Sequence, residues 1–89
     1  MIKTQITIIN KLGLHARAAA KLATCCARFG SQIKVGVDGR LVDGKSVMSL
    51  MLLAASQGTV IDLEVVGSDE QLAHDSIKTL IDDYFGEGE

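Results

Sequence analysis

The chain has 89 residues, of which 47% are hydrophobic, 22% charged and 3% aromatic, and it contains no proline. We expect one domain, residues 1–89, because a chain of this size forms a single core. The composition is globular and excludes collagen-like, disordered and disulfide-rich classes. No apolar run approaches the roughly 20 residues that span a bilayer, and no secretory signal is present. We therefore expect a cytoplasmic protein without membrane insertion.

The formal net charge is −2, but the two halves of the chain have opposite signs. Residues 1–45 hold eight basic and two acidic residues, whereas residues 46–89 hold one basic and nine acidic residues. The split predicts a positive face for an anionic partner, with a chance difference between solvated faces as the alternative. One tyrosine, two phenylalanines and no tryptophan leave little for base stacking, which argues against a nucleic-acid partner.

The hydrophobic periodicity predicts the element order β-α-β-β-α-β-α. The predicted strands are residues 2–8, 33–37, 40–42 and 60–66, and the first two helices are residues 16–29 and 47–57. A capping box of Ser68 and Gln71 begins a closing helix whose apolar face reaches Tyr84. The tail, residues 86–89, is expected to be frayed. This order predicts an α+β two-layer sandwich, an open-faced sheet with helices on one side.

Two features that suggest chemistry are interpreted as structural. Cys25 and Cys26 are adjacent on a predicted helix, where neighbouring side chains diverge by about 100°. A disulfide between them would be strained, and two thiols alone make no metal site, so neither a metal nor a cofactor is predicted. Residues 39–46 match the P-loop pattern G-x-x-x-x-G-K-[ST]. Residues 40–42 are nevertheless predicted to be a strand with paired amides, which argues against nucleotide hydrolysis.

His15 occupies the predicted N-cap position of the first helix, and Arg17 follows within the first turn. A helix N-terminus offers unpaired amides and a partial positive charge, which favour an anion. The guanidinium of Arg17 can donate forked hydrogen bonds to phosphate oxygens. Imidazole, amides and guanidinium together predict a phosphohistidine site, and a histidine that merely caps the helix is the alternative. His74 is interpreted as a surface or packing residue.

The second predicted helix is apolar nearly all round, with Leu50 and Leu53 expected in the core. A short helix on one sheet face buries one side only, so other apolar residues should be partly exposed. Those residues are Val47, Met48, Met51 and Leu52. Exposed, flexible methionines suit a surface that docks several partners, and a fully buried helix is the alternative. Ser46 directly precedes this helix and is its predicted N-cap.

Residues 12–17 (LGLHAR), 43–48 (DGKSVM) and 58–60 (GTV) resemble the HPr family of histidine-containing phosphocarriers, over essentially the whole chain. These proteins belong to the bacterial phosphoenolpyruvate:sugar phosphotransferase system. The resemblance implies a monomer with a four-stranded antiparallel sheet covered on one face by three helices. It further implies a relay protein rather than an enzyme: Nδ1 of His15 accepts a phosphoryl group from phospho-enzyme I and passes it to IIA domains of sugar permeases.

The resemblance also assigns roles to the surrounding residues. Ala16 and Arg17 would bind the phosphate, and Ser46 would be a regulatory serine for an HPr kinase/phosphorylase. The expected docking surface comprises Ala16, Ala20, Lys21, Thr24, Lys45, Val47, Met48, Met51 and Leu52. The family usually has proline where this chain has Ala18, and alanine is equally compatible with a first helical turn. The alternatives are a nitrogen-branch regulatory phosphocarrier and a non-catalytic small-molecule or nucleic-acid binding module.

Overall fold

Alternating apolar and polar residues build the sheet of the computed structural model, which describes all 89 residues. The strands are β1 (Ile2–Thr7), β2 (Gln32–Val37), β3 (Arg40–Asp43) and β4 (Val60–Val66). They pair antiparallel in the order β1-β4-β2-β3. In β4, Ile61, Leu63 and Val65 are buried, and the residues between them are partly exposed. One face of the sheet is therefore dry and the other faces water.

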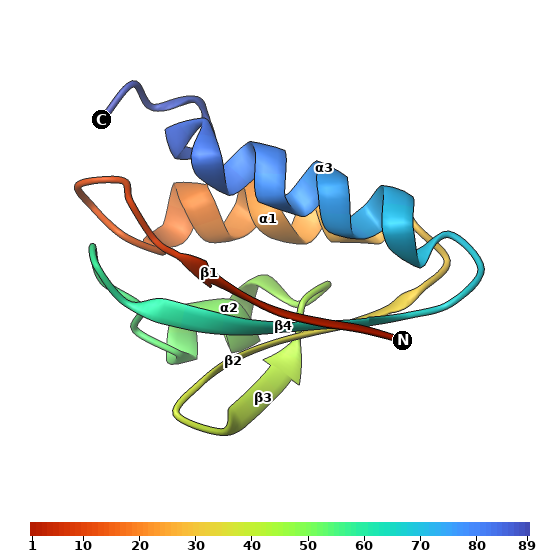
Figure 1. Cartoon of the computed structure of the whole chain (residues 1–89). Helices are drawn as coiled ribbons and strands as arrows, with labels where there is room; N and C mark the ends of the chain where they lie inside the picture. The colour runs from red at the N-terminus through yellow and green to blue at the C-terminus, as the bar shows by residue number, and fades with distance from the viewer.

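The helices complete the second layer. The two longer helices, α1 (Ala16–Ala27) and α3 (Glu70–Asp82), run side by side over the sheet (Figure 1). The short helix α2 (Val47–Leu52) packs against α1 and β3, and a 3-10 turn, η1 (Tyr84–Gly86), follows α3. A single cluster of 21 buried apolar residues joins the layers. The predicted element order and open-faced sandwich are confirmed, and no helix has both the length and the apolarity needed to cross a membrane.

Half of the segment that matches the P-loop pattern is a strand. Its residues 40–43 form β3, in which Arg40 pairs with Val37 and Leu41 with Gly36 of β2. The adjacent cysteines are buried and free, and burial raises the pKa of the Cys26 thiol to about 12. No group of three or more His, Cys, Asp or Glu side chains is arranged to hold a metal ion. The predicted strand at residues 40–42 and the interpretation of the cysteines as apolar core residues are confirmed.

The second helix is shorter than predicted, because α2 ends at Leu52 rather than near residue 57. Ala54 has a left-handed backbone, with φ 52°. The carbonyl of Ala55 accepts a hydrogen bond at 2.7 Å from the N–H of Leu14, in the loop before α1. A left-handed residue does not continue a right-handed helix, so α2 ends before Ala54. The backbone after α2 instead holds the loop that leads to α1.

The closing helix does not begin with the predicted capping box of Ser68 and Gln71. Its N-cap is Asp69, and the Asp69 side chain does not cap α3. The carboxylate accepts the Ser31 hydroxyl and the backbone N–H groups of Gly30 and Ser31, the latter two at 2.9 and 3.0 Å. These hydrogen bonds, that of the Ser31 hydroxyl foremost, lower the pKa of Asp69. Asp69 thus ties the start of α3 to the α1–β2 loop, a contact that local patterning does not reveal.

Candidate functional site

His15 is the N-cap residue of α1, as predicted. Its backbone is extended, with φ −78° and ψ 180°, and its carbonyl accepts the N–H of Ala19 at 2.8 Å. The imidazole makes no hydrogen bond to the first turn, so the alternative of a capping histidine is wrong. The N–H groups of Ala16 and Arg17 lack partners within the helix, as at any helix start. They remain available to an anion.

The loop before α1 is held in place by the core. Gly13 has φ +67°, and a Cβ there would lie 2.5 Å from the carbonyl oxygen of Ala55. Only glycine fits this conformation and this close approach. Asn10 is fully buried and donates from its side-chain amide to the Gly13 carbonyl at 2.7 Å. Leu14 is also buried in the core, and this fixes the position of the adjacent His15.

The His15 ring contacts a residue from the opposite end of the chain. Its Nε2 is hydrogen-bonded to Oε2 of Glu87, while Nδ1 makes no hydrogen bond. The other Glu87 oxygen, Oε1, accepts the side-chain amide of Asn10 at 2.9 Å. Burial alone would raise the pKa of Glu87, but the hydrogen bonds from Asn10 and His15 outweigh it and lower the pKa. Glu87 is therefore an ionised carboxylate at neutral pH.

The C-terminal segment packs against α1, so the prediction of a frayed tail is wrong for Gly86 and Glu87. Tyr84 and Phe85 adopt left-handed conformations, with φ 55° and 52°. The Phe85 side chain is completely buried, and its carbonyl accepts Lys21 Nζ at 2.7 Å. The prediction that Tyr84 lies on the apolar face of the closing helix is wrong, because α3 ends at Asp82 and Tyr84 is exposed in η1. This turn directs the chain back towards the end of the molecule at which α1 begins (Figure 1).

His15 and Arg17 lie in one open hollow of about 630 Å³. The residues lining it are Leu12, His15, Ala16, Arg17, Gly86, Glu87 and Glu89. Arg17 is exposed and makes no ion pair within the chain, so its guanidinium is free to bind an anion. The structure thus brings together His15, Ala16 and Arg17, the residues predicted to receive and bind phosphate.

A larger concavity of about 860 Å³ lies in the groove between α1 and α3. Arg17, Lys21 and Arg28 line its α1 side, and Asp75 and Asp83 line its α3 side. This groove contains no histidine and carries charges of both signs. Arg17 lines both hollows, but only the smaller one contains His15, so size does not identify the candidate site.

The positive face predicted from the charge split is interrupted at the site. Glu87 and Glu89, from the acidic half of the chain, line the hollow around His15. Lys45, at the start of α2, donates to the carbonyl of Phe29 at 2.8 Å. Arg17 is the one cation that lines the hollow, and two carboxylates line it as well.

Ser46 is the N-cap of α2, as predicted. Its backbone is extended, with φ −108° and ψ 112°, and its Oγ accepts the N–H of Ser49 at 3.3 Å. The hydroxyl therefore satisfies one of the free amides of the first turn. The capping role of Ser46 is confirmed.

The apolar residues predicted to be exposed on α2 do face solvent. Met48 is 71% exposed, Leu52 63% and Met51 40%, whereas Leu50 is fully buried. Val47 is half-buried. The alternative of a fully buried second helix is therefore wrong, because α2 displays an exposed apolar patch of flexible side chains.

The other residues of the predicted docking surface are also accessible. Those that the structure leaves exposed are Ala16, Ala20, Lys21, Thr24 and Lys45. The first four belong to α1, which packs against α2. The predicted docking residues thus lie on two neighbouring helices.

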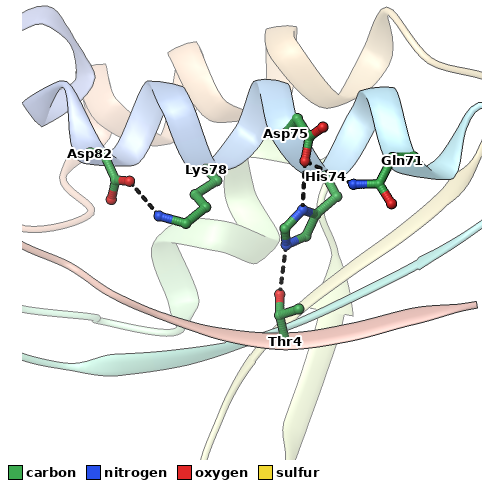
Figure 2. A network of polar contacts seen from close by, with 6 residues as sticks. All are labelled: Thr4, Gln71, His74, Asp75, Lys78 and Asp82. Carbon is green, nitrogen blue, oxygen red and sulfur yellow. Dashed lines mark hydrogen bonds and ion pairs between the residues drawn. The ribbon is translucent and has the colours of Figure 1, made fainter.

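His74, the second histidine, has a different environment (Figure 2). Its Nε2 lies 3.0 Å from Oγ1 of Thr4 on β1, and its Nδ1 lies 3.2 Å from Oδ1 of Asp75. The His74 side chain is 12% exposed, compared with 29% for His15. With both ring nitrogens engaged, His74 links α3 to the edge strand. It is a packing residue, as predicted.

Sequence reasoning missed Asn10, Phe85 and Glu87 at the site. One local signal was present for Glu87, because Gly86 and Gly88 flank it. Both glycines have positive φ, 76° and 81°. Glycines on either side of a charged residue can indicate a specific turn as well as a loose tail. Nothing local indicates that the Glu87 carboxylate reaches a ring 72 residues away.

Comparisons with known proteins agree with this geometry. Residues 2–83 match the family model PTS-HPr, "PTS HPr component phosphorylation site". The phosphocarrier protein HPr of Cupriavidus necator is 53% identical over 89 residues, and that of Neisseria meningitidis serogroup A is 52% identical; each alignment covers 100% of both chains. The crystal structure of HPr-C-His from Thermoanaerobacter tengcongensis superposes with a TM-score of 0.94 at 44% identity, covering 98% of each chain.

The match extends over nearly the whole chain in sequence and in fold. It includes the antiparallel sheet of four strands, the three helices and their order along the chain. A protein of this kind is a relay component and not an enzyme, since it is itself phosphorylated and dephosphorylated. The chain belongs to the HPr family, the phosphocarriers of the phosphotransferase system.

Proposed function

We propose that His15 carries the phosphoryl group, on Nδ1, from phospho-enzyme I to the IIA domains of sugar permeases. One observation carries the proposal: the ring lies at the N-terminus of α1 without capping it, in one hollow with the unpaired guanidinium of Arg17. A nucleophile, free amides and a cation therefore surround the same space. These are the groups that phosphoryl transfer requires.

The transfer is a displacement at phosphorus between two histidines. The lone pair of His15 Nδ1 attacks the phosphorus atom, the bond from phosphorus to the donor ring breaks, and its electron pair returns to that ring. Charge is then spread over the three equatorial oxygens of the phosphoryl group. The N–H groups of Ala16 and Arg17 and the Arg17 guanidinium stabilise that charge by hydrogen bonds. Delivery to a IIA histidine repeats the step with His15 as the leaving group.

Docking uses the exposed residues of α1 and α2. Met48, Met51 and Leu52 supply apolar contact, and Lys21 and Lys45 supply positive charge. Ala16 and Ala20 have small side chains, so a partner backbone can approach His15 closely. Enzyme I and the IIA domains should therefore present an acidic rim around an apolar centre.

Ser46 is the regulatory site in this proposal, phosphorylated by an HPr kinase/phosphorylase. A phosphate adds a charge of about −1.5 to −2 near neutral pH. At a helix N-terminus this charge is tolerated by the fold. Next to the exposed Met48 it would repel the acidic rim of a partner and oppose desolvation of the apolar contact. Phosphorylation therefore acts on docking and leaves the fold intact.

The sugar branch is favoured over the nitrogen branch. Relatives that share about half of their residues with this chain, such as those of Cupriavidus necator and Neisseria meningitidis, are named HPr. The binding-module alternative is set aside, because the chain belongs to a phosphocarrier family.

The experiment compares the two histidines. Incubation with phosphoenolpyruvate and enzyme I should add an acid-labile phosphate to the wild-type chain and none to His15→Ala. His74→Ala is the matched control and should be phosphorylated normally, because both nitrogens of that ring are engaged in packing. Phosphate uptake by His15→Ala would show that another residue is the carrier.

A further inference from the structure

The Glu87 carboxylate is hydrogen-bonded to Nε2 of His15, the ring nitrogen that does not take part in the transfer. The bond joins Nε2 to Oε2 of Glu87, and Nδ1 is left free. An ionised carboxylate only accepts hydrogen bonds, so Nε2 must carry the proton. A neutral imidazole has one N–H, and Nδ1 therefore holds the lone pair.

Several features of the chain hold Glu87 in this place. The Asn10 amide donates at once to the Gly13 carbonyl and to Glu87 Oε1, at 2.7 and 2.9 Å. Its own Oδ1 is buried without any donor. A buried acceptor without a partner is unfavourable, and reversing the Asn10 amide would set oxygen against oxygen at both contacts. The Asn10 amide orientation is therefore set, and it points an N–H at Glu87.

The turn that delivers Glu87 is strained. Tyr84 and Phe85 are consecutive non-glycine residues with left-handed φ. The buried Phe85 ring and the bond from Lys21 to the Phe85 carbonyl hold this turn closed. Such conformations persist where surrounding contacts impose them, and they concentrate at functional sites. The C-terminal turn is built to place one carboxylate on the ring.

We infer that Glu87 is a positioning residue for phosphoryl transfer: it holds the proton on His15 Nε2 and keeps the Nδ1 lone pair facing the hollow. The inference rests on the proposed role of His15 as carrier. Glu87 touches neither the phosphoryl group nor the partner in this scheme, and acts through the ring alone. The lowered pKa of Glu87 supports it, because the carboxylate is then ionised wherever transfer takes place.

The same contact assists the outgoing step. When the phosphoryl group leaves, the bond between phosphorus and Nδ1 breaks and its electron pair returns to Nδ1. If Nε2 keeps its proton, the ring departs as neutral imidazole; if not, it departs as an imidazolate anion, a much poorer leaving group. The receiving histidine forms the new bond to phosphorus. Glu87 therefore keeps the ring in one protonation pattern for both acceptance and delivery.

Glu87→Gln is the sharpest test, because Asn10 dictates how the new amide lies. Its oxygen must accept the Asn10 N–H, so its NH₂ group faces His15 Nε2. The ring proton should then move to Nδ1, where it blocks the nucleophile. We expect nitrogen-15 NMR to show the Nε2–H tautomer in the wild-type chain and the Nδ1–H tautomer in the variant. Phosphorylation by enzyme I should slow by about 10- to 100-fold, as when the hydrogen-bond partner of a functional histidine is lost.

Glu64→Gln is the matched control, since it removes an equal charge from β4 and Glu64 lines neither the hollow nor the docking surface. Its tautomer and transfer rate should match those of the wild-type chain. Glu87→Ala is a second variant that removes the acceptor without adding a donor, and it should give a mixture of tautomers and an intermediate rate. It also keeps the test available if the glutamine variant folds poorly, which thermal unfolding of each protein would reveal.

The outcomes separate the two proposals. An Nδ1–H ring in the wild-type chain would overturn the positioning role. An unchanged tautomer or an unchanged transfer rate in Glu87→Gln would also overturn it. If Glu87→Gln does not fold, the same result in Glu87→Ala would do so. Phosphate found on a residue other than His15 in the wild-type chain would instead overturn the proposed function, whatever the NMR shows.

Discussion

Two helices of this chain begin at residues that the HPr resemblance links to phosphate, and the two side chains are used differently. Ser46 accepts the N–H of Ser49 and caps α2. His15 occupies the same position on α1, but its ring turns to Glu87 and leaves the first turn uncapped. In α2, one of the free amides of the first turn is therefore used by the cap, which stabilises the helix. The uncapped helix keeps those amides for a ligand.

The packing of the two helices explains why each arrangement is tolerated. The helix α1 has 12 residues, six of them buried, whereas α2 has six residues with only Leu50 buried. Short helices are marginal without tertiary support. A helix with many buried residues can leave its N-terminus open, and a short exposed helix depends more on its cap. The contrast predicts loss of function from changes near His15 and smaller, separable effects from changes at Ser46.

The largest effect in this comparison is expected for Arg17→Ala. The guanidinium is unpaired in the free protein and should be used only when phosphate is present. Removing one such preorganised donor typically costs about 100-fold or more in rate. Rapid-quench measurement of phosphate transfer from phospho-enzyme I would test this. Arg28→Ala, an exposed arginine at the far end of α1, should stay close to the wild-type rate; equal losses would indicate general charge attraction.

An intermediate effect is expected for Ser46→Asp. The added charge should slow phosphorylation of His15 by about tenfold through repulsion at the docking surface. The melting temperature should not fall, because an acidic residue at a helix N-terminus is favourable. Transfer kinetics and thermal unfolding would be measured on the same preparations. Ser68→Asp, an exposed serine just before α3, is the control and should transfer phosphate normally. A slow Ser46→Asp protein that also melts early would point to damage to the fold.

The smallest effect concerns the cap itself. Ser46→Ala removes the acceptor for the Ser49 N–H and should lower the free energy of unfolding by about 1 kcal/mol. Ser68→Ala should change it by less than about 0.5 kcal/mol, because Ser68 is exposed and caps nothing. Urea denaturation of the two variants would give both values. Equal losses would revive the capping box that the structure replaces with Asp69.

Local patterning predicted those parts of the site that depend on neighbouring residues. His15, Arg17 and Ser46 are recognisable because a helix start requires only the few residues around it. The strand that disqualifies the P-loop pattern follows likewise from residues 40–42 and the turn before them. The length of α2 was not predictable in this way, since the helix ends where Ala54 turns left-handed and where Ala55 binds Leu14 of a distant loop.

The amino-acid sequence by itself thus determined the sandwich, the N-cap histidine with its arginine, and the apolar patch on α2. These follow from periodicities of two and 3.6 residues and from helix-end chemistry, which act over a few residues. Only the tertiary structure decided that Asp69 binds the α1–β2 loop and that Glu87 binds His15. Both carboxylates find their donors across long stretches of chain, where partners are chosen by how the layers pack. Glu87, which the sequence places in a frayed tail, is therefore part of the candidate site in the folded chain.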